Sequence, residues 1–329
     1  MEERWTIGMN VINRKRKVAL AGLGDIAHKV YLPLLAHHEK VEVAGVMSRS
    51  EATVQRVTQN YRFPLGTTDL EELLSWDLDA VFVHSPTETH YDVVKACLER
   101  GVSVYVDKPL TTDLTKSREL AALASKKGLL LAVGFNRRFA PLYVRAKAWV
   151  EETGGFVQAA AAKHRTTLQK GSSSDTIYDD LIHMLDLLLW LGGSDYELLH
   201  HHLSEDEQGR LLHTSGELGL GRNVTGRYSM IRQAGADMEK LELHGSGRSA
   251  EIVNLERAVL CEHGRPPETR EFGSWEPILH RRGFSGAVDH FLEHLASPED
   301  CTIRAERVMR SHELASRLAE QQKGGTDNG

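Results

Sequence analysis

The residues of this sequence best suited to proton transfer are Lys108, Asp179 and His183. Asp179 and His183 are four positions apart within residues 176–191, a strongly apolar run that predicts a helix, so one helix face is expected to carry both side chains. An imidazole oriented by a neighbouring carboxylate can act as a general base. A structural Asp–His pair, buried for packing, is the alternative.

Lys108 lies in the segment Asp107-Lys108-Pro109, which directly follows the apolar run 102–106. This run predicts a buried strand, and open parallel sheets bind their ligands beyond the carboxyl ends of the strands. A lysine in that place can hold a substrate hydroxyl and, with a lowered pKa, share in proton transfer. An exposed loop lysine is the alternative interpretation.

A glycine turn joins the apolar run 18–21 to a helical pattern, and its residues are Gly22, Leu23, Gly24, Asp25, Ile26 and Ala27. The two glycines let the backbone approach a pyrophosphate closely, and the helix that opens there directs unpaired N–H groups toward it. The motif alone is weak because glycines also serve ordinary turns. The strands and helices that follow favour a dinucleotide site built from these six residues.

The choice of dinucleotide depends on the end of the second predicted strand, residues 41–47. Ser48 and Arg49 stand there in place of the carboxylate that binds the ribose hydroxyls of NAD. Without a carboxylate there, the 2′-phosphate of NADP is not repelled, and Arg49 can pair with it. NADP is therefore favoured as the cofactor, and use of NAD is the alternative. A solvated Arg49 at a helix start is the alternative.

A third segment expected to contact the dinucleotide follows the predicted strand 80–84. Its assigned cofactor contacts are Ser85, Pro86, Thr87 and His90, together with Lys108 further along the chain. Thr87 or Thr89 as a helix cap, and His90 as a packed structural histidine, are the alternatives.

A basic set near the predicted junction of the domains is assigned to substrate binding, and it consists of Arg137, Lys163 and Arg165. These cations suit an oxygen-rich or anionic ligand, and a solvated surface is the alternative for each. Histidines and cysteines do not occur with the spacing of metal ligands, so no metal site is predicted.

The composition excludes several classes of protein. The 329 residues are 41% hydrophobic and 26% charged, which is typical of a globular chain of two domains. A net charge of -6 disfavours nucleic acid as a partner, and no apolar run is long enough to span a membrane. An odd number of scattered cysteines and an N-terminus without secretory features predict a reduced, cytoplasmic location.

The order of the predicted elements divides the chain into four parts: a flexible extension over 1–15, a dinucleotide-binding domain over 16–135, a C-terminal domain for substrate binding and oligomerisation over 136–322, and a disordered tail over 323–329. The first domain alternates strands and helices, which predicts an α/β fold with a doubly wound parallel sheet. The second is predicted as an α+β domain with an open, mostly antiparallel sheet. Its predicted strands include an antiparallel 156–165 and the runs 217–230 and 238–244.

Taken together, these motifs resemble the Gfo/Idh/MocA oxidoreductases over nearly the whole chain. The glycine turn matches the turn of that family, Asp107-Lys108-Pro109 matches its Glu-Lys-Pro motif, and Asp179 and His183 fall where the family carries its Asp and His. The stretches 79–85 and 133–143 resemble the MviM-type branch of the family. The resemblance implies a Rossmann domain followed by the open-sheet domain, with Lys108, Asp179 and His183 as the catalytic set.

Two residues depart from the pattern of the family. Asp107 stands where most relatives have the longer Glu, and Leu181 replaces a small residue that many relatives place before the histidine. A larger Leu181 would narrow the substrate cleft, so these departures bear on the identity of the substrate.

The resemblance also implies an activity: an NAD(P)-dependent dehydrogenase or reductase that acts on CH–OH groups, moving hydride between the cofactor and a secondary alcohol or ketone. A sugar, polyol or derivative is the implied small-molecule substrate, and a homodimer or homotetramer formed through the open sheet is the implied assembly. The alternative is a non-catalytic regulatory protein of the same fold that binds nucleotide and sugar. The joint presence of Lys108, Asp179 and His183 argues against that alternative.

Overall fold

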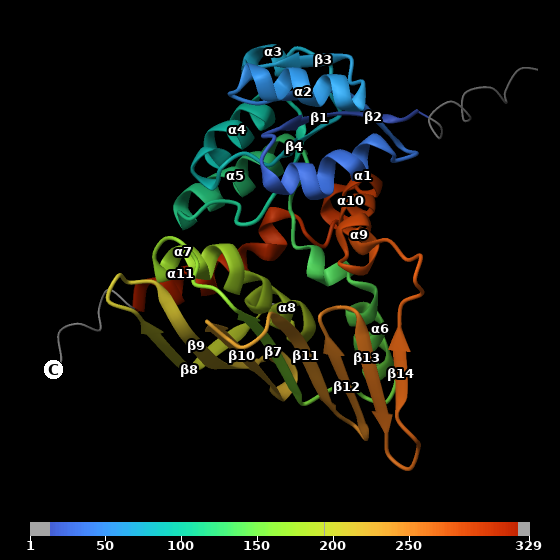
Figure 1. The fold of residues 1–329 in the computed structure, drawn as a ribbon, viewed down its shortest axis with the longest axis vertical. Coiled ribbons are helices and arrows are strands. Elements are labelled where there is room, and N and C mark those ends of the chain that lie inside the picture. The colour runs from blue at the N-terminus through green and yellow to red at the C-terminus, as the bar shows by residue number, and fades with distance from the viewer. Residues whose placement is uncertain (1–13, 194, 322–329) are drawn as a thin grey trace, which may run out of the picture.

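The computed structural model describes residues 14–193 and 195–321, and two sheets organise them (Figure 1). Nearly all of the predicted N-terminal extension and the whole of the tail 323–329 lie outside the described residues. Within the part of the chain that is described, no helix has the length and apolar character needed to cross a membrane.

The N-terminal sheet is parallel, with its six strands in the order β3-β2-β1-β4-β5-β6. This is the doubly wound order of dinucleotide-binding folds and confirms the predicted fold class. The side chains of β4 and β5 are entirely buried, which is typical of a parallel sheet covered on both faces. The strands are β1 (Arg16–Ala21), β2 (Val41–Met47), β3 (Leu65–Thr67), β4 (Ala80–Val83), β5 (Ser103–Val106) and β6 (Leu131–Val133).

Three helices of this domain start at polar caps that the sequence supplies. Ser50, Asp69 and Asp113 each accept a backbone hydrogen bond at a helix start, and Gly128 ends one helix with φ of 66°. The helical segments are the π-helical turn η1 (Ala27–Tyr31), α1 (Leu32–Ala36), α2 (Glu51–Tyr61), α3 (Leu70–Leu74), α4 (Thr87–Glu99) and α5 (Leu114–Lys127).

The C-terminal sheet has eight strands in the order β14-β13-β12-β11-β7-β10-β9-β8. Helices α6 (Pro141–Glu151) and α8 (Ile182–Gly192) pack against it, the first over β11, β12 and β13, the second over β7 and β10. The strands are β7 (Gln158–Arg165), β8 (Tyr196–Glu205), β9 (Leu211–Leu220), β10 (Val224–Arg232), β11 (Met238–Gly245), β12 (Arg248–Val253), β13 (Arg257–Glu262) and β14 (Glu268–Glu271).

Two details of this sheet correct the expectations. Strand β7 was expected to be antiparallel, but it pairs antiparallel only with β11 and runs parallel to β10. The reason is that a helical crossover follows β7 and the meander of β8, β9 and β10 then returns in the direction of β7. The predicted run 217–230 is divided between β9 and β10 by the 3₁₀ turn η4 (Gly221–Asn223).

The helix predicted over 176–191 is a composite of three helical segments. It begins at Ser172, which caps α7 (Ser173–Thr176), continues as the π-helical turn η3 (Ile177–Leu181), and ends with α8. A π turn holds more residues than an α turn, so it changes which side chains share a face across the junction. Asp179 lies in η3 and His183 lies in the first turn of α8.

The end of the chain returns to the N-terminal sheet. Val133 of β6 donates a backbone hydrogen bond to Ile303 at 2.9 Å, and the ring of Phe291 packs edge-on against Phe82 and Tyr105. The remaining helical segments are η2 (Asn136–Phe139), α9 (Ile278–Arg281), α10 (Phe284–Glu293), η5 (Pro298–Asp300) and α11 (Ala305–Gln321). Helix α11 contacts both α5 and α8, so it joins the two domains beside the site described next.

Candidate active site

A cavity of about 640 Å³ opens at the carboxyl ends of β1, β2, β4 and β5. This is the place where a doubly wound sheet binds its ligand. The predicted cofactor residues that line it are Gly22, Leu23, Gly24, Asp25, Ile26, Ser48, Arg49, Ser85 and Pro86. Further lining residues that were not assigned from the sequence are Met47, Thr53, His84, Thr89, Val93 and Asp107, and Asp179 closes the set.

Four of the predicted cofactor residues do not line this cavity: Ala27, Thr87, His90 and Lys108. Ala27 is fully buried behind the glycine turn. Thr89 lines the cavity in place of Thr87. Its hydroxyl donates hydrogen bonds at 2.7 Å to the Ser85 hydroxyl and to the Pro86 carbonyl. The turn after β4 is thereby fixed by Thr89.

The glycine turn fits a dinucleotide. Gly22 has φ of 97°, and a Cβ atom there would come within 2.2 Å of the Ser85 backbone nitrogen, so only glycine is accommodated. A Cβ on Gly24 would meet no atom within 4 Å, because this residue faces open space. An approaching phosphate can therefore reach the backbone at Gly24, as the motif requires.

His84 is a polar lining residue that sequence reasoning missed. Its ring stacks on Tyr31 at 3.8 Å between centroids, and neither ring nitrogen has a hydrogen-bond partner in the described chain. Burial lowers the pKa of His84 to about 3, so the ring is neutral and its two nitrogens are one donor and one acceptor. The signal in the sequence was a histidine at the end of an otherwise apolar strand.

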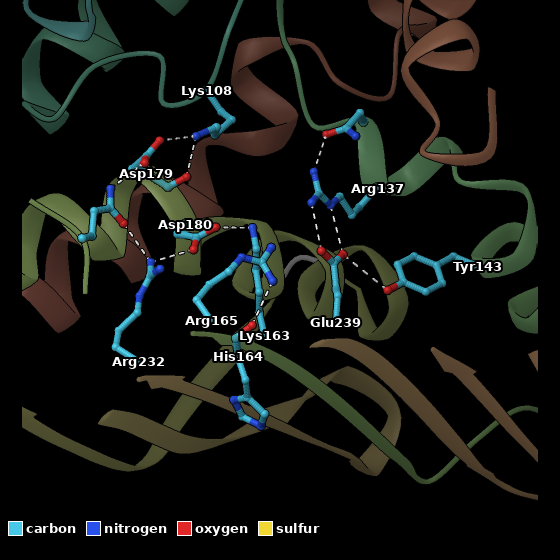
Figure 2. A network of polar contacts seen from close by, with 12 residues as sticks. Lys108, Arg137, Tyr143, Lys163, His164, Arg165, Asp179, Asp180, Arg232 and Glu239 are labelled. Carbon is cyan, nitrogen blue, oxygen red and sulfur yellow. Dashed lines mark hydrogen bonds and ion pairs between the residues drawn. The ribbon is translucent and has the colours of Figure 1, made fainter. Parts of the chain in front are cut away.

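Lys108 and Asp179 meet between the two domains. The Lys108 ammonium donates to the Asp179 carboxylate at 2.7 Å and also to the Asp179 backbone carbonyl (Figure 2). The second carboxylate oxygen of Asp179 accepts a hydrogen bond from Gln169 at 2.6 Å. The lysine side chain is 11% exposed, so Asp179 holds a nearly buried cation at the end of the cavity.

The loop that carries Lys108 is fixed on both sides of the lysine. The cis peptide Lys108–Pro109 is followed by Leu110, whose N–H donates to Nε2 of His312 on α11 at 2.9 Å. The two ring nitrogens of His90 lie 2.9 Å from the carbonyls of Pro109 and Ser85. His90 thus connects the loops after β4 and β5, and it supports the cavity without lining it.

His183 is buried next to this ion pair, with 6% of its surface exposed. Its Nδ1 atom has no hydrogen-bond partner among the described residues. Burial and the charges of Arg137, Lys163, Lys108 and Arg165 hold the pKa of His183 well below its usual range. The expected contact with Asp179 is not among the hydrogen bonds of the described residues, where the Asp179 carboxylate accepts from Lys108 and Gln169 instead.

The three residues assigned to the substrate have different settings (Figure 2). Arg137 donates two hydrogen bonds to Glu239 at 3.0 and 2.9 Å, and both side chains are buried. Lys163 is buried in an ion pair with Asp180, and burial and the charge of Arg137 lower the pKa of Lys163 to about 8. Among the described residues, the Arg165 side chain donates to the carbonyl of its neighbour His164, at 2.9 Å.

Comparison with known proteins gives the family. Residues 16–135 match the oxidoreductase family with an NAD-binding Rossmann fold, and residues 141–263 match the YceM-like C-terminal domain. The chain is 34% identical over 306 residues to YceM of Salmonella typhimurium, which covers 91% of this chain and 97% of YceM. The chain belongs to the Gfo/Idh/MocA oxidoreductases. This confirms the family, the oxidoreductase class and the Rossmann domain that the motifs predicted.

Two further relatives of this Gfo/Idh/MocA chain bear on fold and chemistry. The structure of a dehydrogenase, MviM, from Clostridium difficile superposes with a TM-score of 0.86 and 32% identity, over 95% of this chain and 100% of that one. The inositol 2-dehydrogenase of Rhodococcus jostii is 35% identical over 135 residues, which are 40% of this chain and 37% of that protein.

Proposed function

We propose that this protein moves hydride between a nicotinamide cofactor, NADP in preference to NAD, and a secondary alcohol or ketone of a sugar, polyol or derivative. The observation that carries the proposal is the Lys108–Asp179 ion pair at the end of the cavity, with His183 beside it. The inositol 2-dehydrogenase relative supports a polyol or sugar as the substrate.

Lys108 is suited to hold the reacting oxygen. An ammonium has three donors, and two of those on Lys108 are directed at Asp179. The third has no partner among the described residues and can donate to the hydroxyl or carbonyl oxygen of a substrate. Because the loop is anchored by His90 and His312, the ammonium keeps its position while the substrate enters and leaves.

His183 is suited to take the hydroxyl proton. A neutral imidazole has an acceptor nitrogen, and His183 lies beside the Lys108–Asp179 ion pair, where the reacting oxygen would be held. The surrounding cations keep the ring neutral before the reaction. A bound nicotinamide would supply the hydride acceptor or donor, and it would lie in the cavity lined by the glycine turn, Arg49 and His84.

The direct test is the absorbance of reduced nicotinamide. The purified protein is mixed with sugars, polyols, inositols and the corresponding keto compounds, with NAD(H) and NADP(H) in parallel. Turnover of one class, abolished in Lys108→Ala, would support the proposal. Tight nucleotide binding without turnover of any compound, the result expected of a regulatory protein, would contradict it.

Arg49 is expected to determine the preference for NADP. Arg49 lines the cavity after β2 and has no ion-pair partner in the described chain, while Ser50 is occupied as the cap of α2. Arg49→Ala should raise KM for NADP roughly 10- to 100-fold and leave KM for NAD nearly unchanged, because a charged hydrogen bond to the 2′-phosphate is lost. Steady-state kinetics with both cofactors measure this split, and an equal effect on both would exclude the phosphate contact.

His183 is expected to stay neutral through the pH range in which histidines usually titrate. Because burial and nearby cations lower its pKa, the free protein should bind this proton only well below pH 6.5. Proton NMR follows the imidazole, with His183→Asn to assign the signal. Arg165→Gln removes one of the cations and should raise the midpoint. A midpoint at or above 6.5 in the wild type would refute this setting for the ring.

A further inference from the structure

The segment 166–172, which joins β7 to α7, is fixed at both of its ends. Thr166 donates hydrogen bonds from its N–H and from its hydroxyl to the Asp237 carboxylate, at 2.8 and 3.0 Å. Ser172 caps α7 in a capping box, so the other end of the segment is held as well. Gln169 lies between these two anchors, and its backbone therefore has little freedom to move.

The side-chain amide of Gln169 joins two ion pairs. Its nitrogen donates to one carboxylate oxygen of Asp179 at 2.6 Å, and its oxygen accepts from the guanidinium of Arg232 at 2.8 Å. The other carboxylate oxygen of Asp179 accepts from the Lys108 ammonium at 2.7 Å. Gln169 thus connects the ion pair at the end of the cavity with a buried arginine of β10.

Arg232 determines which way the amide of Gln169 faces. A guanidinium has donors and no acceptor, so the amide oxygen must face Arg232 and the amide NH₂ group must face Asp179. Arg232 is held in its turn: its side chain is 5% exposed, and it donates at 2.6 Å to Asp180, which is also paired with Lys163 (Figure 2). A flipped amide would place its oxygen against the Asp179 carboxylate and its NH₂ group against a cation.

The Asp179 carboxylate needs both of its donors because the side chain is 60% exposed. An exposed carboxylate with one partner can rotate, and its rotation would shift the Lys108 ammonium that it holds. Partial desolvation raises the pKa of Asp179, but the charge of Lys108 and the hydrogen bonds from Lys108 and Gln169 outweigh it and hold the pKa below its usual value. Gln169 therefore favours both one orientation and the charged form of this carboxylate.

We propose that Gln169 and Arg232 are positioning residues of the candidate active site. Gln169 fixes the Asp179 carboxylate by a hydrogen bond whose direction Arg232 imposes, and Asp179 in turn holds Lys108 where the reacting oxygen would bind. The inference rests on the proposed function for the role of Lys108 in turnover. The contacts of Gln169 can be tested without that role.

The first experiment compares the kinetics of Gln169→Leu and Gln169→Glu with those of the wild type. Leucine removes the donor to Asp179, so kcat should fall roughly 10-fold. Glutamate keeps the shape of glutamine but turns a second carboxylate toward Asp179, so kcat should fall further, roughly 10- to 100-fold. KM for NADP should stay unchanged in both variants, because Gln169 does not line the described cofactor cavity.

The order of the two variants separates positioning from packing. If Gln169 only filled space, the isosteric Gln169→Glu would be the more active variant, whereas donation to Asp179 predicts the opposite order. Both variants should also move the acid limb of the pH profile of kcat/KM to higher pH, because Asp179 is then protonated more readily. Gln59→Glu, which changes an exposed glutamine of α2, is the matched control. Wild-type kcat in Gln169→Glu would overturn the inference.

The second experiment detects the hydrogen bond without turnover. Proton–nitrogen NMR follows the side-chain amide of Gln169, with Gln169→Leu to assign its signals. Donation to a carboxylate should move one amide proton downfield and slow its exchange with water, and both Asp179→Asn and Arg232→Met should reduce these effects. Signals typical of an exposed glutamine, unchanged in both variants, would overturn the inference. If no compound is turned over but the variants still move these signals, the proposed function fails and the positioning contacts stand.

Discussion

Replacement of Lys108 by alanine is expected to lower kcat roughly 10²- to 10⁴-fold, with little change in the affinity for the nicotinamide cofactor. The ammonium is held by Asp179 at 2.7 Å, next to the cavity but outside its lining, so its removal affects the reacting oxygen and not the dinucleotide. Steady-state kinetics and fluorescence titration with NADPH measure the two effects separately.

The matched variant for this prediction is Lys126→Ala, which changes an exposed lysine of α5 and should leave kcat unchanged. His183→Ala is expected to reduce kcat to a similar extent as Lys108→Ala, because the base is lost while the lysine remains. Near-normal turnover of Lys108→Ala would remove the lysine from the mechanism. If Lys108→Ala lost cofactor affinity to the same extent as kcat, the lysine would have a structural role and not a catalytic one.

The parallel sheet of the N-terminal domain could be predicted from local sequence patterns. Apolar runs that alternate with capped helices indicate parallel strands, and the glycine turn after β1 marks the edge where the cavity lies. The neighbours of β7 could not be predicted in this way. They depend on where strands more than sixty residues away return to the sheet, which no local period encodes.

In the candidate site too, the sequence predicted which residues take part but not which of them are in contact. The sequence pointed to Lys108 and Asp179 as members of one site, although they are 71 residues apart and no local signal says that they touch. It placed Asp179 against His183 from the spacing of the two residues, whereas the Asp179 carboxylate is bound by Lys108 and Gln169, which lie outside this helix. It also identified Arg137 as a cation near the site without its partner Glu239, which is 102 residues away on β11.

The buried ion pair of Arg137 and Glu239 is expected to stabilise the folded protein, so that breaking it lowers the free energy of unfolding. Glu239→Ala should lower the free energy of unfolding by about 3–5 kcal/mol, because it leaves the Arg137 guanidinium buried without a counter-charge. Urea denaturation followed by circular dichroism measures the change. Glu217→Ala, which breaks the exposed pair with Arg227, should cost about 0–1 kcal/mol and is the control.

The pH dependence of this difference follows from the pKa of Glu239. Burial would raise that pKa, but Arg137, with smaller contributions from Lys163 and Arg165, outweighs burial and holds it at about 2, below the 4.5 of a free glutamate. A depressed carboxyl pKa favours the folded state above the unfolded value and loses that contribution as the pH falls. The gap in stability between wild type and Glu239→Ala should therefore be full at pH 7 and shrink as the pH falls from 4.5 toward 2. A gap that stays constant over this range would mean that the variant acts through packing and not through the ion pair.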